Sequence, residues 1–163
     1  MEQIILHDIQ NVLKGTPRPH YLVGEAKIDL LEGNKIRFAG TALFPLSDPS
    51  IADRKDHVNV TATLFALWNA AHLMGRQKGL KHFRATKLSI SCFKVFLPEN
   101  IVSFTVSAKF VEVPSPQCEM LITELVPQKK VNLIDSLVYG SLQATFALDK
   151  EKVAEIECRF VGW

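Results

Sequence analysis

The segment HVNVTATLFALWNAAHLMG, residues 57–75, contains no Asp or Glu, and its large apolar residues spread around the circumference of a helix. A helix this apolar does not lie on the surface of a small protein. We therefore predict a central helix over residues 57–75, enclosed by the rest of the chain. Four alanines along it, Ala62, Ala66, Ala70 and Ala71, predict close packing against neighbouring strands.

The flanking sequence alternates between apolar and polar residues with a period of two, which is typical of half-buried strands. The turn signal Glu32-Gly33-Asn34 lies between two such segments and predicts a hairpin. A polar loop is expected over residues 45–56. The expected strands are residues 22–30, 36–44, 86–97, 102–110, 118–126, 138–148 and 156–160. This alternation favours an antiparallel sheet with one solvated face.

One long buried helix inside an antiparallel sheet resembles the hot dog architecture, of the α+β class, and this resemblance implies acyl-thioester chemistry. Residues 1–15 place isoleucines, Val12 and Leu13 among polar residues before Gly15, which predicts an additional N-terminal helix. A chain of 163 residues is most simply one domain, residues 1–163.

The overall composition limits the binding partners and the cellular compartment that we expect. A net charge of +2 gives no argument for nucleic acid. The three cysteines form no CxxC pair, so we expect no metal, no disulfide framework and a reduced, cytoplasmic setting. No signal peptide is evident, and no apolar run approaches the roughly 20 residues of a membrane span. No cofactor is expected.

Polar residues on the central helix are the first candidates for a site. Thr61, Asn69 and His72 fall within about 80° of one another around the helix axis. Asn69 lies in mid-helix, which favours a functional role. His72 is more typical of a half-exposed histidine near the helix C-terminus, and Asn59 is also compatible with an N-cap.

The segment GTALFPLSDPSIADRKDHVNVTATLFALWNAAH, residues 40–72, resembles the FcoT-like long-chain fatty-acyl-CoA thioesterases of the hot dog superfamily. In that family two asparagines and two tyrosines form the site. The Asp56-His57-Val58-Asn59 segment matches the family's His-x-Asn core, and Asn69 matches the helix asparagine. One tyrosine position falls at Ile51, beside Ser50. Tyr21 is near the other but aligns better with a strand residue.

The resemblance implies catalytic roles for Asn59, Asn69 and His57. It implies substrate contacts for Ser50, Ile51, Thr61 and His72. The standard hot dog mechanisms use a helix carboxylate as base, but residues 58–80 contain none. Our hypothesis from the sequence is that Asn69 orients water, while Asn59 and nearby backbone N–H groups polarise the thioester carbonyl.

Two other functions remain open. The chain could be a dehydratase-like subunit for hydroxyacyl thioesters, in which His57 works with a carboxylate from another hot dog chain. Alternatively, it could be a non-catalytic acyl-binding module.

Basic residues follow the central helix, among them Arg76, Lys81 and Arg84. They form either a solvated face or a contact for the phosphates of coenzyme A or of a carrier-bound phosphopantetheine. The expected partners are therefore an acyl-CoA or acyl-carrier-protein thioester. The resemblance also implies a homodimer or higher homo-oligomer, or a hetero-oligomer with another hot dog chain.

Overall fold

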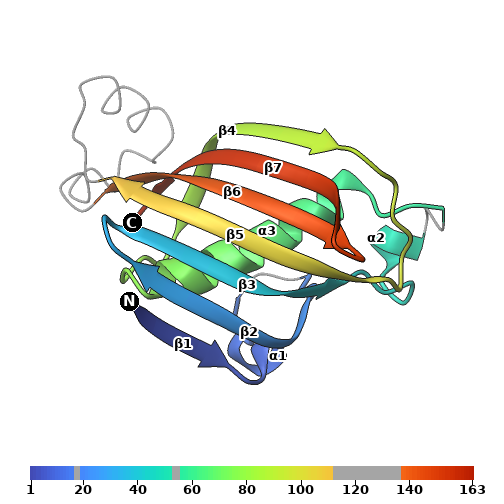
Figure 1. Ribbon diagram of the computed structural model, residues 1–163, viewed down its shortest axis with the longest axis horizontal. Coiled ribbons are helices and arrows are strands. Elements are labelled where there is room, and N and C mark those ends of the chain that lie inside the picture. Colours follow the sequence, from blue (N-terminus) through green and yellow to red (C-terminus); the bar gives the residue numbers. More distant parts are fainter. Residues whose placement is uncertain (17–18, 53–55, 112–136) are drawn as a thin grey trace.

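A curved antiparallel sheet wraps around one long helix in the computed structural model, which describes residues 1–16, 19–52, 56–111 and 137–163 (Figure 1). Within those ranges the sheet has seven strands in the order β1-β2-β3-β5-β6-β7-β4. The strands are β1 (Glu2–Leu6), β2 (Leu22–Leu31), β3 (Lys35–Leu43), β4 (Phe83–Cys92), β5 (Ile101–Val111), β6 (Val138–Leu148) and β7 (Glu151–Gly162). The expected strand over residues 118–126 lies outside the described residues.

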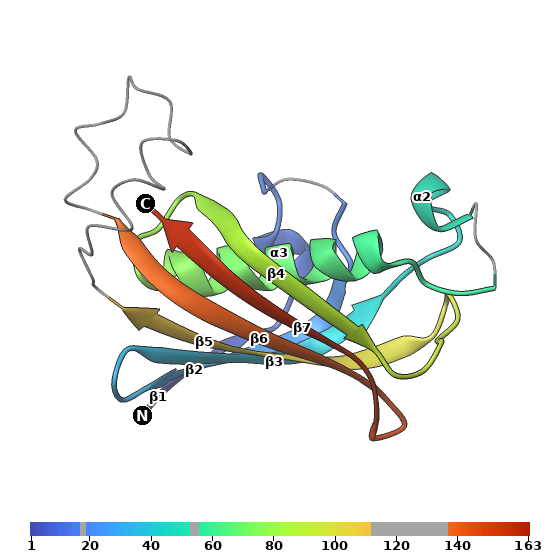
Figure 2. The same cartoon turned by 90° about the horizontal axis from the view of Figure 1, so that it is seen from above.

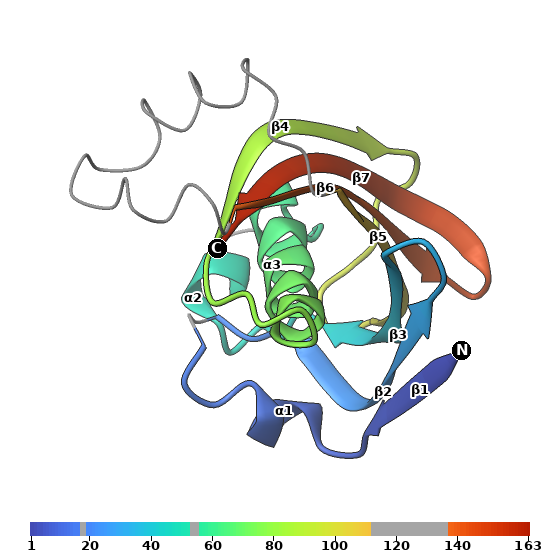
Figure 3. The same ribbon diagram turned by 90° about the vertical axis from the view of Figure 1, so that its left-hand side faces the viewer.

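Helix α3 (Val60–Arg76) is the predicted central helix. It begins three residues later than the predicted start at residue 57, because Asn59 caps its N-terminus. It lies along the concave face of the sheet, as seen almost along its axis in Figure 3. No helix among the described residues has both the length and the apolar character needed to cross a membrane.

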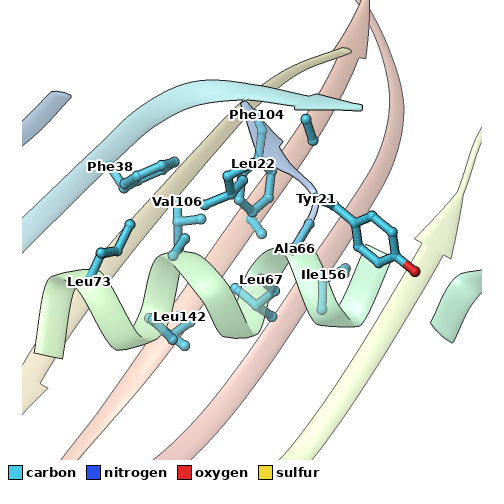
Figure 4. Packing of buried hydrophobic residues seen from close by; sticks show 14 of the residues in the cluster. Tyr21, Leu22, Phe38, Ala66, Leu67, Leu73, Phe104, Val106, Leu142 and Ile156 are labelled. Carbon is cyan, nitrogen blue, oxygen red and sulfur yellow. The ribbon is translucent and has the colours of Figure 1, made fainter. Parts of the chain in front are cut away.

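The core fills the space between α3 and the sheet. Alanines at Ala62, Ala66, Ala70 and Ala71 are buried, so the helix backbone approaches the strands closely. Aromatic rings supply the volume from the sheet side: Phe104 and Phe146 stack with their ring centroids 4.5 Å apart. Figure 4 shows Leu67, Leu73 and Ala66 of α3 among side chains of the sheet.

The β2–β3 hairpin confirms the turn expected from Glu32-Gly33-Asn34. Gly33 and Asn34 both have positive φ, 68° and 57°. Two consecutive residues of this kind match the right-handed twist of the flanking strands. The turn also fixes the register in which Ile28 pairs with Phe38, so both side chains reach the core.

Two local expectations require correction. The N-terminal helix is present but covers only Ile9–Val12 (α1), because Glu2–Leu6 pair with β2 as an antiparallel edge strand. Ile4 and Leu6 also alternate with a period of two, so both conformations suit that segment. In addition, the expected loop over residues 45–56 contains a short helix, α2 (Pro49–Ala52), which lies beyond the N-terminal end of α3 (Figure 2).

The arrangement is the α+β hot dog fold predicted from the sequence. The fold determines where the segments that form the candidate site lie. The α2 loop lies beyond the N-terminal end of α3, whereas the segment before β2 lies beside the middle of the helix, where Asn69 contacts it (Figure 2).

Candidate functional site

The side chain of Tyr21 meets the α2 loop. Its ring is buried against Phe44, with the ring centroids 4.9 Å apart. Its hydroxyl points away from the apolar side chains labelled in Figure 4 and donates to Oδ2 of Asp48 at 2.8 Å. The same phenol oxygen lies 3.2 Å from Oγ of Ser50. A hydroxyl carried by the core thus reaches a carboxylate carried by a loop.

Asp48 owes its position to the start of α2. Its Oδ1 accepts hydrogen bonds from the Ser50 hydroxyl at 2.7 Å and from the Ser50 backbone N–H at 2.9 Å. Pro49 occupies the first helical position, where the missing N–H costs nothing. Ile51 is buried and anchors the loop to the core. Ile51, for which the resemblance implies contact with substrate, therefore contacts the protein interior.

Asn59 joins this loop to the central helix. Its Oδ1 accepts from the backbone N–H of Ala62 at 2.8 Å, and its Nδ2 donates to the carbonyl oxygen of Ser50 at 3.0 Å. The N-cap interpretation of Asn59 is therefore correct, and the amide has a second structural contact.

Asn69 binds the other side of Tyr21. Its Oδ1 accepts from the Tyr21 backbone N–H at 3.2 Å, and its Nδ2 donates to the carbonyl oxygen of Pro19 at 3.4 Å. Only 2% of its surface is exposed. The two asparagines thus lie at opposite ends of one hydrogen-bonded chain, Asn69–Tyr21–Asp48–Ser50–Asn59, which we call the Asp48 network.

Hydrogen bonding sets the protonation of this network. Partial burial opposes ionisation of Asp48, but hydrogen bonds from Ser50 and Tyr21 outweigh it and lower the pKa of the carboxyl group. Burial, with a smaller contribution from Asp48, raises the pKa of Tyr21 to about 12. At neutral pH the pair is therefore a carboxylate and a neutral phenol that donates to it.

A cavity of about 700 Å³ opens onto the Asp48 network. Asp48 and Tyr21 line it together with His20, Lys14 and residues of the loop before α2. This volume lies within the range of small-molecule sites. An ionised carboxylate at the wall of such a cavity can accept a proton from bound water.

A second hollow, which we call the helix cleft, lies beside the first turn of α3 and has a volume of about 570 Å³. Residues of the helix start line it (His57, Asn59, Val60, Thr61 and Thr63), as do residues of the β4 end (Cys92, Phe93, Lys94, Val95 and Phe96). The Nδ1 atom of His57 lies 3.0 Å from Oδ1 of Asp56. No acidic residue lies in the first turn of α3, so its positive end is not neutralised locally.

The structure does not gather all of the predicted site residues. His72 packs edge-on against Phe83, with the ring centroids 5.7 Å apart, and burial together with Arg76 and His82 lowers its pKa. It does not join Asn69 in a common polar site.

The basic residues expected to contact phosphate also lie away from the Asp48 network. Arg76, Lys81 and Arg84 are exposed around the C-terminal end of α3, about 25 Å along the helix from its start. Arg76 donates to the Val12 carbonyl oxygen at 3.0 Å. Within one chain, this cluster and the Asp48 network do not share a site.

Sequence reasoning missed Asp48 because it searched the helix for a carboxylate. The signal was the Asp-Pro-Ser sequence of residues 48–50, in which an aspartate before proline caps a turn of helix. The family alignment matches Tyr21 to a strand residue. Instead it lies immediately before β2, where a side chain can leave the sheet. Among the described residues, no group of three or more His, Cys, Asp or Glu side chains could hold a metal ion.

Comparisons with known proteins give no match to a protein-family profile and no match to a curated protein sequence. Solved structures do resemble the chain. A candidate thioesterase from Lactococcus lactis, yhdA, has a TM-score of 0.55 at 8% identity, covering 83% of this chain and 87% of its own. A cysteine-to-alanine variant of the HP0420 homologue from Helicobacter felis has a TM-score of 0.51 at 11% identity, covering 94% and 85%.

A probable thioesterase from Bartonella henselae has a TM-score of 0.50 at 7% identity, covering 77% of this chain and 90% of its own. At such identities the likeness concerns the fold alone. It agrees with the hot dog arrangement described above.

Proposed function

We propose that this protein hydrolyses acyl thioesters and that Asp48 is its general base. The observation that carries the proposal is the Asp48 carboxylate, held ionised by Tyr21 and Ser50 at the wall of a 700 Å³ cavity. Its place at the N-terminal end of the central helix supplies the carboxylate that the helix sequence lacks. Two proteins of similar fold, described as a probable and a candidate thioesterase, support this class of reaction.

In the proposed reaction, Asp48 accepts a proton from water as the water oxygen attacks the acyl carbon. The carbon–sulfur bond then breaks, and the proton passes to the departing thiolate. The products are a carboxylic acid and a thiol. Positioned proton transfer of this kind contributes about 10²–10⁴ in rate.

The negative charge that develops on the carbonyl oxygen needs donors. We assign this role to the first turn of α3, where Asn59 caps the N–H of Ala62 but leaves those of Val60 and Thr61 without a partner in the helix. Oriented N–H groups at a helix start favour an anion. Asn59 and Asn69 are then positioning residues rather than direct participants.

The substrate class follows from the family resemblance. In FcoT-like enzymes, asparagines and tyrosines form the site, and here Tyr21 connects Asn69 to the rest of the Asp48 network. We therefore propose a fatty-acyl or polyketide-type chain, carried by coenzyme A or a carrier protein.

The cavity at Asp48 and the helix cleft share no lining residue, so in this proposal the thioester lies between them, beside the hydrogen-bonded Ser50 and Asn59. The acyl group then extends into the helix cleft past His57 and Thr61.

A homodimer through β4 completes the proposal. This strand ends the sheet, and its second edge pairs with no described strand. Unpaired edges of this kind are templates for a further strand. Leu88 on β4 and Phe93 after it are 42% and 58% exposed.

Antiparallel pairing of two β4 strands would bring the start of the partner's strand beside the end of this one. The start of β4 carries Arg84, and its end, at Cys92, lines the helix cleft. The basic cluster of one subunit would then approach the helix cleft of the other, as binding of an anionic carrier requires.

The dehydratase-like alternative rests on His57, which lines the helix cleft beside Asp56. It requires a carboxylate from another hot dog chain. Co-purification with such a chain, together with dehydration of a hydroxyacyl thioester, would favour it.

Thiol release from acyl-CoAs of increasing chain length tests the hydrolase proposal. We expect turnover by the native protein and a loss of about 10²–10⁴ in kcat/KM for Asp48→Asn. Asp149→Asn is the matched control, because Asp149 is an exposed turn residue with positive φ, which asparagine tolerates. Acyl-CoA binding without turnover would support an acyl-binding module instead. Full activity of Asp48→Asn would exclude Asp48 as the base.

A further inference from the structure

Four cations form a row across the outer face of the sheet, opposite α3. Residue pairing places Lys35 of β3 directly opposite Lys109 of β5, and Lys87 of β4 directly opposite Arg159 of β7. Ser141 of β6 pairs with both Lys109 and Arg159 and so continues the row between them. Figure 1 faces this side of the sheet, with α3 behind the strands.

The row places like charges opposite one another, which is unfavourable on a sheet surface. Like charges directly opposite one another on neighbouring strands destabilise the pairing. Among the described residues, none of the four cations takes part in an ion pair. Glu157, two residues before Arg159 on β7, lies on the same face of the sheet and lines the same hollow. The fold therefore tolerates two repulsive pairs that a single acidic substitution in each would remove.

The row borders a hollow of about 510 Å³. All four cations line it, with Ser89, Ser107, Ser141 and Gln143 as hydrogen-bonding groups and Glu157 as the one carboxylate. Strands lie about 4.8 Å apart, so the four cations span roughly 19 Å from β3 to β4. Several positive charges with hydroxyl groups between them, around a hollow of ligand size, match a ligand with several anionic groups.

We propose that this hollow binds a small polyanion that carries two or more linked phosphate groups, such as a nucleoside triphosphate. A bound polyphosphate would neutralise the repulsion within both cationic pairs. The site lies on the opposite face of the sheet from α3, so the proposal does not depend on thioester hydrolysis.

Calorimetric titration with ATP and with inorganic tripolyphosphate tests the site. We expect both ligands to bind at low salt, and more weakly at high salt. Equal affinities would mean that only the phosphates are recognised, whereas tighter ATP binding would mean that the hollow also contacts the nucleoside. Failure of both ligands to bind would overturn the proposal. Binding of only an acidic peptide or a nucleic acid would overturn it as well.

Two double variants localise the binding. Lys35→Gln/Lys109→Gln and Lys87→Gln/Arg159→Gln should each weaken binding at least tenfold. Lys27→Gln/Lys150→Gln, which changes exposed lysines outside the hollow, should leave it unchanged. Acyl-thioester hydrolysis should be the same in all of them. Equal binding by native protein and both row variants would place the ligand elsewhere and refute the proposal.

A stability measurement tests the electrostatic argument without any ligand. Lys109→Glu places opposite charges on β3 and β5, so it should raise the Tm of the free protein while it weakens ATP binding. Ligand should raise the Tm of the native protein but not of the row variants. A lower Tm for Lys109→Glu, or unchanged ATP binding by it, would contradict the proposed role of the row.

Discussion

The phenol oxygen of Tyr21 lies 2.8 Å from Oδ2 of Asp48, although 27 positions separate the two residues in the chain. Tyr21 is fixed by the core, while Asp48 belongs to a loop. This hydrogen bond therefore transfers the rigidity of the core to the carboxylate that we propose as the base. The first two predictions concern it directly.

Tyr21→Phe should move the acid limb of the pH–activity profile to higher pH. The Tyr21 hydrogen bond lowers the pKa of Asp48, so its removal raises that pKa, and the base is then protonated at a higher pH. The ring contact with Phe44 is retained. The profile of kcat/KM against pH measures the shift. Tyr139→Phe, which removes a phenol hydroxyl from β6, is the matched control. An unchanged acid limb in Tyr21→Phe would mean that Tyr21 does not influence the pKa of the catalytic base.

Alkaline titration gives an independent test of Tyr21. Its pKa is raised from 10.0 to about 12 in the folded state, so the neutral phenol contributes stability that is complete below pH 10. That contribution is lost as the pH rises through the folded pKa. Denaturant unfolding should therefore show a steeper fall in unfolding free energy between pH 10 and 12 for native protein than for Tyr21→Phe. If unfolding free energy fell equally with pH in the native protein and in Tyr21→Phe, the pKa of Tyr21 would not be raised by folding.

Asn69→Ala should lower the unfolding free energy by about 1–3 kcal/mol, because it leaves the buried Tyr21 N–H without its acceptor. For a protein of this size, each kcal/mol corresponds to about 2–4 °C in Tm. Asn11→Ala, on the exposed surface of α1, is the control. Complete loss of hydrolysis with unchanged stability would instead favour the water-orienting role that the sequence suggested for Asn69.

Two glycines should differ in their tolerance of a methyl group. A Cβ at Gly140 would lie 2.5 Å from the backbone oxygen of Lys109 and 2.5 Å from the Phe160 ring, whereas the nearest atoms to a Cβ at Gly75 would belong to the Phe83 ring. A ring can rotate or shift, but a strand backbone is held by its neighbours. Thermal unfolding should therefore show both alanine variants destabilised by about 1–3 kcal/mol, with Gly140→Ala the worse. The reverse order would show that the Phe83 ring is held more firmly than β5.

The proposed dimer predicts that Leu88→Lys shifts the sedimenting species from dimer to monomer. Leu88 is 42% exposed on the edge strand β4, and a charge there would be buried by a partner strand. Leu46→Lys, at a similarly exposed leucine in a loop, should remain dimeric. A native protein that sediments as a monomer at all concentrations would refute pairing through β4.

Much of the fold could be predicted because it depends on local periodicity. The absence of acids from residues 57–75 identified the central helix, and alternation identified the hairpin before it. The first residues could not be assigned in this way. Ile4 and Leu6 suit either a helix or a strand, and the free edge of β2 decides between them.

The candidate site was only half predictable for a related reason. Asn59 and Asn69 stand out as polar residues at the start and in the middle of an apolar helix. Asp48 is one of several polar residues in its loop, and nothing local indicates that Tyr21 will reach it. That contact depends on how residues 27 positions apart meet in space.

The position of Asp48 has a consequence for how such a protein can change over generations. Its carboxylate comes from a short surface connection, whereas the apolar helix and the strands around it carry the stability of the molecule. If Asp48 is the base that we propose, exchange of a few residues around positions 45–52 would remove, restore or redirect hydrolysis while the scaffold stays intact. The same connection is the natural segment to randomise in a library that seeks new substrates on this framework.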